Sequence, residues 1–229
     1  MKTAGDIKGM KAAKYGGQQP TGRFDLFGRV TLDILGADYK YATGFGGAKK
    51  VLNAMRRREV DIQTIGLNLY RLSAERPLVK SGKAIPLYYY PWPGYTATKA
   101  QIFPDGIPSF DEYYMKVNGK APSGELYDTF KWMSTTLNGM SYSAFLPPKT
   151  PSEPLKILQA SYAEAVKDSK LQAEQKKAFG YSFPYISPAQ GAKVISSMVN
   201  APEKYRKFLI DYIAERARHK VKKKKKGGK

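Results

Sequence analysis

The sequence predicts an α/β fold built around a central, mostly parallel β-sheet. Two consecutive segments in its first third share one design, which is a short aromatic strand, a glycine-containing turn, an amphipathic helix and a further strand. Two such units predict a βαβαβ arrangement, because a helical crossover returns the chain parallel to the strand before it. The last third predicts helices alone, since its apolar residues recur at helical spacing after helix-start signals.

The first unit is expected to have a strand over 10–15, a turn over 16–22 and a helix to residue 35. Thr21 is placed to cap that helix, and Asp25 puts a negative charge in its first turn, where the helix dipole favours one. Gly36 follows as a helix-ending residue.

The second unit is expected to have a strand over 39–42, a turn over 43–47, a helix over 48–58 and a strand over 61–67. Three of the five turn residues are glycines, so the backbone can come close to a ligand, and the helix that follows presents unpaired N–H groups to an anion. Ligands of parallel sheets bind outside the carboxyl ends of the strands. The sequence therefore predicts an anion site where the two turns and the loop starting at Asn68 meet; the alternative is that both turns are plain connectors.

Further along, the sequence predicts both helices and strands. A weak helix over 72–81 is expected to break at Pro77. Thr150 is expected to cap a helix whose Leu155, Leu158 and Tyr162 line a buried face. The remaining expected elements are strands at 85–90 and 141–146, and helices at 109–119, 123–137, 170–179, 187–199 and from 200 onward.

Part of the net charge of +20 lies at the C-terminus, where residues 216–229 hold nine of the 39 basic residues, and the rest is spread along the chain. Residues 220–229 are expected to form a disordered Lys-rich tail, because like charges repel and nothing there packs. Such a tail can contact nucleic acid or another anionic surface without sequence preference. An alternative function is therefore a basic binding module that acts through this tail.

Signals for enzymatic chemistry are missing from the sequence. The chain has no cysteine, and its single histidine, His219, adjoins the lysine tail with no carboxylate cluster to form a metal or catalytic site. Nucleophile-elbow and phosphate-loop motifs are absent. We therefore expect no catalytic residues, no metal, no cofactor and no enzymatic activity.

No apolar run approaches the roughly 20 residues of a membrane span, and the N-terminus has no signal-peptide core.

Several short motifs occur in the order in which one receptor family carries them. They are KYGG at 14–17, GFGG at 44–47, REVD at 58–61 and LPPKTP at 146–151, followed by a terminal helix after Pro202-Glu203. In this order they resemble the substrate-binding receptors of tripartite tricarboxylate transporters, the Bug or TctC-like family. The resemblance covers about residues 6–217.

The resemblance implies a periplasmic-binding-protein-like fold of the type II, Venus-flytrap kind, closing around a small carboxylate for the membrane components of a transporter. It implies a complete ligand-binding lobe over 1–138 and the mainly helical C-terminal part of the other lobe over 139–219. It also implies a periplasmic monomer, although without a signal peptide ahead of residue 1 the chain would be cytoplasmic. Because the chain starts where family members enter their second lobe, we expect weak carboxylate binding.

Carried over position by position, the resemblance implies a set of ligand contacts in the predicted turns. Asp61 is expected to be a structural turn residue, since its charge would repel an anion. Gly44 and Gly46 stand where the family has proline and lysine, and Phe45 replaces its tyrosine. The implied ligand-binding residues are Gly17, Gln18 and Thr21 in the first turn, Phe45, Gly46, Gly47 and Ala48 in the second, and Asn68 in the third loop.

Overall fold

The computed structural model describes residues 4–91, 106–138 and 143–226, with side chains described as far as Glu215. The chain forms two compact units, each built from separated segments. Unit 1 comprises Met1–Gly66, Asp111–Met133 and Asn200–Lys229, and unit 2 comprises Leu67–Phe110 and Ser134–Val199. The sequence predicted one division near residue 138. The chain instead enters unit 1 three times, because aromatic residues of its middle and terminal segments pack within that unit.

Unit 1 contains a three-stranded sheet in the order β2-β1-β3, with both neighbouring pairs parallel. The strands are β1 (Ala13–Gly16), β2 (Tyr39–Ala42) and β3 (Ile62–Gln63). The prediction of an α/β fold with a parallel sheet is confirmed. The third strand is much shorter than the expected 61–67, because only its first residues reach β1.

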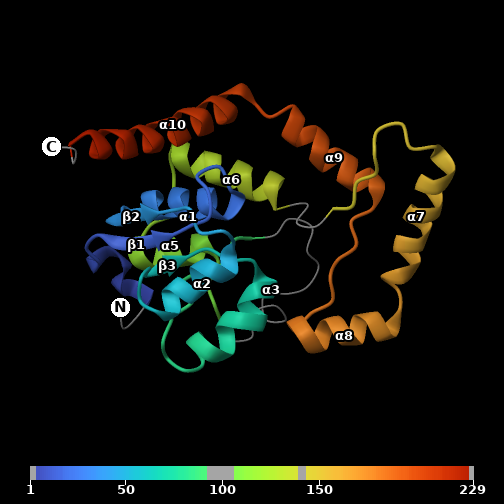
Figure 1. Cartoon of the computed structure of the whole chain (residues 1–229), viewed down its shortest axis with the longest axis horizontal. Helices are drawn as coiled ribbons and strands as arrows, with labels where there is room; N and C mark the ends of the chain where they lie inside the picture. Colours follow the sequence, from blue (N-terminus) through green and yellow to red (C-terminus); the bar gives the residue numbers. More distant parts are fainter. Residues whose placement is uncertain (1–3, 92–105, 139–142, 227–229) are drawn as a thin grey trace. The chain divides into compact units, whose positions relative to one another are not determined.

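Helices α1 (Arg23–Ile34) and α2 (Ala48–Arg56) cover opposite faces of this sheet (Figure 1). The Tyr15 hydroxyl donates a hydrogen bond to the Phe24 carbonyl of α1 at 3.0 Å. On the next residue, Gly16, a Cβ would lie 2.7 Å from Cγ1 of Val51 in α2. Successive strand residues point to opposite faces, so the two helices sandwich the sheet.

The core of unit 1 is aromatic and brings distant segments together. Phe27 of α1 meets Phe130 edge to face, with ring centroids 6.1 Å apart. Phe130 lies in α6 (Glu125–Leu137), which follows α5 (Phe110–Asn118) along the chain. Tyr15, Tyr113 and Phe130 are all buried. The short helix η1 (Ala4–Gly9) adds the fully buried Ile7 to the same unit.

Helix α10 (Glu203–Lys226) returns the end of the chain to unit 1. Tyr205 stacks on Trp132 with ring centroids 5.3 Å apart, and the Tyr212 hydroxyl donates to the Asp33 carboxylate. The helix is described as far as Lys226, so it includes residues 220–226 of the predicted Lys-rich tail, and 227–229 lie outside the described residues. Lysine is a good helix former, positive charge suits a helix C-terminus, and preceding turns supply the nucleus.

Unit 2 begins with α3 (Leu67–Leu69) and η2 (Tyr70–Val79), a ten-residue π-helix. Pro77 lies inside η2, so the predicted break there is wrong. A π-helix pairs each N–H with a carbonyl five residues earlier, as the Lys80 N–H does with the Glu75 carbonyl. That wider turn leaves room for a proline ring that would clash in an α-helix.

Two predicted strands of unit 2 do not form in the described residues. Within 85–90 the only pairing there is an isolated bridge between Tyr89 and Ser109. Residues 143–146 are irregular, and 141–142 lie outside the described residues. A tyrosine-rich run has strand propensity but becomes a strand only where a neighbouring strand pairs with it.

The helices of unit 2 are α7 (Ser152–Ala165), α8 (Ser169–Phe179) and α9 (Pro188–Val199). The predicted cap of α9 is confirmed: the Ser187 N–H donates to Gln190 Oε1 at 2.9 Å, and the Gln190 N–H donates back to Ser187 Oγ at 3.3 Å. The predicted cap of α7 is wrong, because the Thr150 hydroxyl donates to the Pro147 carbonyl at 2.7 Å instead.

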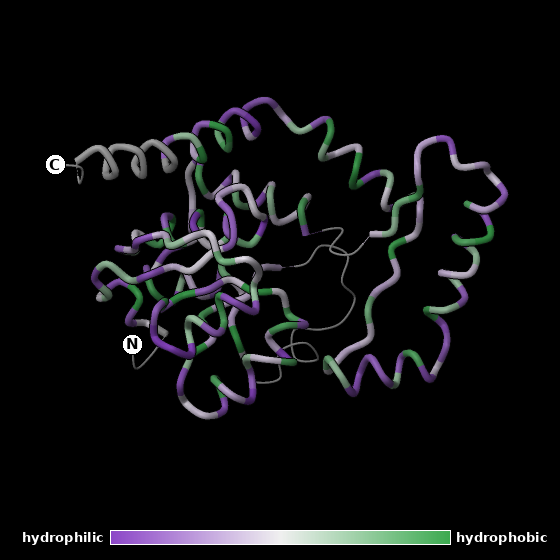
Figure 2. The backbone as a smooth tube through the Cα atoms, viewed as in Figure 1, coloured by the Kyte–Doolittle hydropathy of each residue, from purple (hydrophilic) through white to green (hydrophobic). Residues whose placement is uncertain are grey.

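The buried face predicted for α7 is exposed. Apolar residues recur along α7 in Figure 2, yet no residue of this helix is buried and Tyr162 is 57% exposed. The apolar periodicity predicted the helix correctly, but it did not predict whether another part of the chain packs against its apolar face. None of the helices in the described part of the chain has the length and apolar character needed to cross a bilayer.

Alkaline pH is expected to unfold unit 1. Burial and nearby Asp6 raise the pKa of Tyr113 from 10.0 to about 12, and burial and nearby Asp111 raise that of Tyr127 to about 12. The folded state therefore holds these protons more tightly than the unfolded state. The stability this provides is complete below pH 10 and is lost as pH rises toward 12.

Urea unfolding followed by circular dichroism at neutral pH and at about pH 11 measures this loss. Tyr113→Phe, which cannot ionise, should reduce the difference between the two pH values. Ionisation of the buried tyrosines without any fall in the urea midpoint would contradict the expectation.

Candidate functional site

The turns after β1 and β2 lie side by side at the carboxyl edge of the unit 1 sheet. The Gly17 N–H donates to the Ala42 carbonyl at 2.8 Å, and the Gly44 N–H donates to the Gln18 carbonyl at 3.1 Å. These two bonds extend the β1–β2 pairing into the turns. The structure therefore brings the two predicted turns together, and it also uses the backbone groups of Gly17 and Gln18 that were expected to face a ligand.

The first turn already holds a carboxylate, that of Asp25. This side chain is only 3% exposed, and its Oδ2 accepts the Gln19 N–H at 2.8 Å and the Tyr41 hydroxyl at 2.6 Å. A Cβ on Gly17 would lie 2.4 Å from the same oxygen. The first turn thus surrounds a carboxylate that belongs to the protein itself, whereas the sequence predicted a site for an external anion.

Thr21 takes no part in this cradle. Gly22 is the N-cap residue of α1, it makes no side-chain cap, and Thr21 is exposed. The sequence recognised Asp25 only as a favourable charge for the helix dipole. Its position as the third residue of α1, directly after the turn that follows the strand of the buried Tyr15, is the signal that could have revealed its role.

Arg29 lies one helical turn beyond Asp25 and is fully buried. Its Nε donates to the Asp25 carbonyl at 3.3 Å, and its Nη2 donates to the Pro20 carbonyl. The guanidinium carbon lies 4.7 Å from the ring centroid of Tyr41 and 5.4 Å from that of Tyr212. Such ring faces stabilise a buried cation, so Arg29 fixes the first turn to α10. Sequence reasoning did not identify this residue.

Burial and the hydrogen bond to Asp25 raise the pKa of Tyr41 well above its ordinary value. Tyr41 therefore stays protonated and donates to the carboxylate throughout the physiological range. The first turn is thus occupied by the carboxylate of Asp25, with Tyr41 as a donor to it, while Nη1 of the buried Arg29 has no hydrogen-bond partner among the described residues.

The second turn has no internal anion. Gly47 is the N-cap of α2 with φ at +146°, no side chain caps the helix, and its first turn contains no acidic residue. A Cβ on Gly46 would lie 3.2 Å from the Nζ of Lys50, so that ammonium group stands over the glycine. The first turn of α2 thus offers backbone donors and a cation at an exposed position.

Phe45 is a packing residue rather than part of the exposed surface of this turn. It packs against the buried cluster formed by Val51, Ala54 and Val60 beneath α2. An aromatic ring that follows a strand can contact a ligand or pack in the core. The ring of Phe45 packs in the core beneath α2.

Gln63 connects the second turn to the end of β3. Its Nε2 donates to the Ala48 carbonyl at 2.8 Å, while its buried Oε1 has no hydrogen-bond donor among the described residues. The strand order is β2-β1-β3, and the two connecting helices lie on opposite faces of the sheet. The order of the strands therefore reverses between β1 and β3, and α/β sheets commonly bind ligands at such a point. The sequence missed Gln63, because the expected strand over 61–67 placed it inside the sheet.

The remaining two expectations concern Asn68 and Asp61. Asn68 lies in unit 2, where its Oδ1 accepts the Tyr181 hydroxyl at 2.9 Å, so it is not grouped with the unit 1 turns. Asp61 is confirmed as a structural turn residue, since its Oδ2 accepts the Lys14 N–H at 2.8 Å.

Comparison of the chain with family models, with curated proteins and with solved structures finds no match. Within the described residues, no group of three or more histidine, aspartate or glutamate side chains is arranged to hold a metal ion.

Proposed function

We propose that this chain is a receptor-like protein that binds a small carboxylate at the turn between β2 and α2. The contrast between the two neighbouring turns carries the proposal. The first is filled by the carboxylate of Asp25, whereas the second has the same strand–turn–helix design and no carboxylate of its own. The internal carboxylate of Asp25 at the first turn supports the choice of a carboxylate as the ligand of the second.

Three features of the second turn favour the binding of an anion. The backbone N–H groups that open α2 carry the positive end of the helix dipole. Lys50 adds a full positive charge over Gly46. The glycines leave no side chain between a ligand and the backbone. Because the site is exposed, we expect a dissociation constant of about 1 mM.

The wider role follows from the motif order. We propose a periplasmic-binding-protein-like receptor of the type II kind, which delivers its ligand to the membrane components of a tripartite transporter. The carboxylate site in unit 1 would form one side of the ligand-binding cleft that such receptors close around their ligand. Gly46, Gly47 and Ala48 are retained as ligand-binding residues, whereas Gly17, Gln18 and Phe45 are assigned to the structure around them.

An amide-resolved NMR titration of the full chain with succinate tests this function. We expect shifts to concentrate at residues 45–50 and to be small at Gln18 and Gln19, where the internal carboxylate is already bound. Gly46→Ala should weaken binding several-fold, because its methyl group stands between ligand and backbone. Gly9→Ala is the matched control, since a Cβ there would have no atom within 4 Å.

A second pair of variants separates the cation from general surface charge. Lys50→Gln should weaken succinate binding, whereas Lys49→Gln, which removes an equal charge from the same exposed helix turn, should have little effect. Equal losses in the two variants, or shifts spread evenly over the lysine-rich surface, would refute the proposal.

A basic binding module is the second candidate function, and the extent of α10 is the observation that favours it. The helix continues through Lys226, so its terminal lysines follow a helix that is anchored in unit 1 rather than a free tail. A response to succinate confined to residues 216–226, and equalled by sulfate, would favour this candidate over the carboxylate receptor.

A further inference from the structure

Helix α7 of unit 2 carries an apolar stripe on its surface. Leu155 and Leu158 are 39% and 45% exposed, Tyr162 is more exposed still, and no residue of the helix is buried. Of the twelve large apolar side chains that are exposed in the described residues, nine lie between 143 and 199. At about 100 Å² for each half-exposed side chain, these nine present an area of the order of 900 Å². A standard protein–protein interface takes about 800 Å² from each partner.

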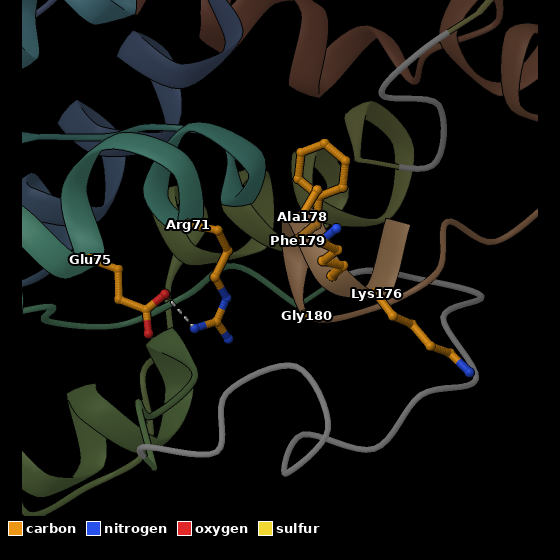
Figure 3. Close-up of a pocket in the computed structure, with 7 residues that line it drawn as sticks. Arg71, Glu75, Lys176, Ala178, Phe179 and Gly180 are labelled. Carbon is orange, nitrogen blue, oxygen red and sulfur yellow. Dashed lines mark ion pairs between the residues drawn. The ribbon is translucent and has the colours of Figure 1, made fainter. Parts of the chain in front are cut away.

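Helix α7 is anchored within unit 2 at its C-terminal end. The Val166 carbonyl, directly after the helix, accepts a hydrogen bond from Gln172 Nε2 of α8 at 2.9 Å. The other end of α8 lies beside η2, and the two line a pocket of about 300 Å³ (Figure 3). Just beyond that end, the Tyr181 hydroxyl donates to Oδ1 of Asn68. The apolar stripe therefore belongs to a helix that is fixed to its neighbours.

The stripe has the spacing of a helix–helix contact. Its members are separated by three, four and three residues, which is the a and d pattern of a coiled coil. The stripe consists of Leu155, Leu158, Tyr162 and Ala165. The flanking e and g positions are also uncharged, being Pro154, Gln159, Ser161 and Val166. The charged residues occupy the outward b, c and f positions and are Glu153, Lys156, Glu164 and Lys167.

The charge of this helix favours a second copy of the chain as the occupant of the stripe. The whole chain has a net charge of +20, so two copies repel each other across most of their surface. Residues 152–167 are an exception, because two acidic and two basic residues leave them with no net charge. Nucleic acid and anionic lipid attract an excess of positive charge, which this helix lacks. Two copies can therefore meet at α7 without repulsion.

We propose that α7 pairs with α7 of a second copy, antiparallel and about a two-fold axis. In an antiparallel pair an a position faces a d position, so Leu158 of one copy lies against Tyr162 of the other, and Leu155 lies against Ala165. The symmetry makes each of these contacts twice. The antiparallel orientation also places opposite ends of the two helix dipoles side by side. The pairing does not depend on the turn between β2 and α2.

Sedimentation equilibrium of the full chain over a concentration series tests the proposal. We expect a reversible dimer with a dissociation constant of about 10 μM, since the paired helices are short. Leu158→Glu should weaken the dimer at least about tenfold, because it brings a charge into an uncharged contact. Ile157→Glu is the matched control and should leave the dimer unchanged. Ile157 is exposed on the same helix but lies at an outward c position, and neither change disturbs a buried side chain.

A charge-swap pair tests the orientation of the two helices. Leu158→Lys and Tyr162→Glu should each weaken self-association, and mixing the two variants should restore it in part. The introduced lysine faces the introduced glutamate only in the antiparallel pair. A parallel pair would place each position against its own copy, so no recovery on mixing would overturn the proposed arrangement.

Two further results would overturn the second copy as the occupant. One is a chain that stays monomeric at about tenfold above the expected dissociation constant, or that loses association equally with Leu158→Glu and Ile157→Glu. The other is a monomer that binds phosphatidylcholine vesicles and loses that binding with Leu158→Glu, because the stripe would then be a lipid-binding face. Gly46→Ala should leave the dimer unchanged even where it abolishes succinate binding, so this test is separate from that of the carboxylate turn.

Discussion

Replacing Gly28 with alanine is expected to lower the free energy of unfolding by about 3 kcal/mol, through overpacking of the core. A Cβ at this position of α1 would lie 2.0 Å from the Tyr15 hydroxyl oxygen and 2.6 Å from Oγ1 of Thr64. Tyr15 cannot move away, because it is fully buried and its ring stacks on Tyr41 at 5.9 Å. The gain in helix propensity from glycine to alanine, about 1 kcal/mol, is too small to compensate.

A double-mutant cycle with Tyr15→Phe isolates the clash, measured by urea unfolding. Tyr15→Phe alone should cost about 1 kcal/mol, for the lost bond to the Phe24 carbonyl. In that background Gly28→Ala should cost less than in the wild-type chain, because the nearest atom has been removed. Gly9→Ala, which meets no atom within 4 Å, is the control for a glycine change without contact. Full additivity of the two changes would contradict the packing described.

The second large effect is expected at Asp25. Asp25→Ala should lower the free energy of unfolding by about 3 kcal/mol, because the Tyr41 hydroxyl and the Gln19 N–H both lose their acceptor. The change also leaves the buried Arg29 without the nearby carboxylate. Asp38→Ala removes an exposed aspartate three residues after Leu35, the C-cap of α1, and should change stability little.

Chemical rescue then distinguishes a carboxylate cradle from a generally fragile turn. Formate should raise the urea midpoint of Asp25→Ala more than it raises that of the wild-type chain, because it binds only where the cradle is empty. Chloride at the same ionic strength is the control for general salt effects. An equal response of both proteins to formate would show that the turn does not recognise a carboxylate.

Much of unit 1 was predictable because its signals are local. The repeated strand, glycine turn and apolar helix predicted β1, β2, α1 and α2, and the parallel order followed from the crossover rule. Gly36 follows α1 in the left-handed conformation expected of a helix-ending glycine. The reciprocal bonds of Ser187 and Gln190 follow from a spacing of three residues alone.

The predictions that were wrong concern features that depend on partners distant in the sequence. Residues 85–90 have strand composition but find only an isolated bridge, and the apolar side of α7 remains uncovered. The candidate site was predictable as two glycine turns at one edge. The sequence did not predict which of the two turns is free of an internal carboxylate. That depends on the Asp25 side chain reaching the first turn and on the Tyr41 hydroxyl donating to it there. Neither contact has a sequence pattern.

The return of α10 to unit 1 has a consequence for how the chain folds. The bond between Asp33 and Tyr212 joins residues 179 positions apart, and the whole of unit 2 is encoded between them. On the ribosome the first 66 residues therefore emerge long before the helix that completes their unit. Contacts of such high sequence separation form slowly, since the intervening loop must be closed first. The nascent β1–β2–β3 segment must wait, with the aromatic surface around Arg29 uncovered, until almost the entire chain has been synthesised.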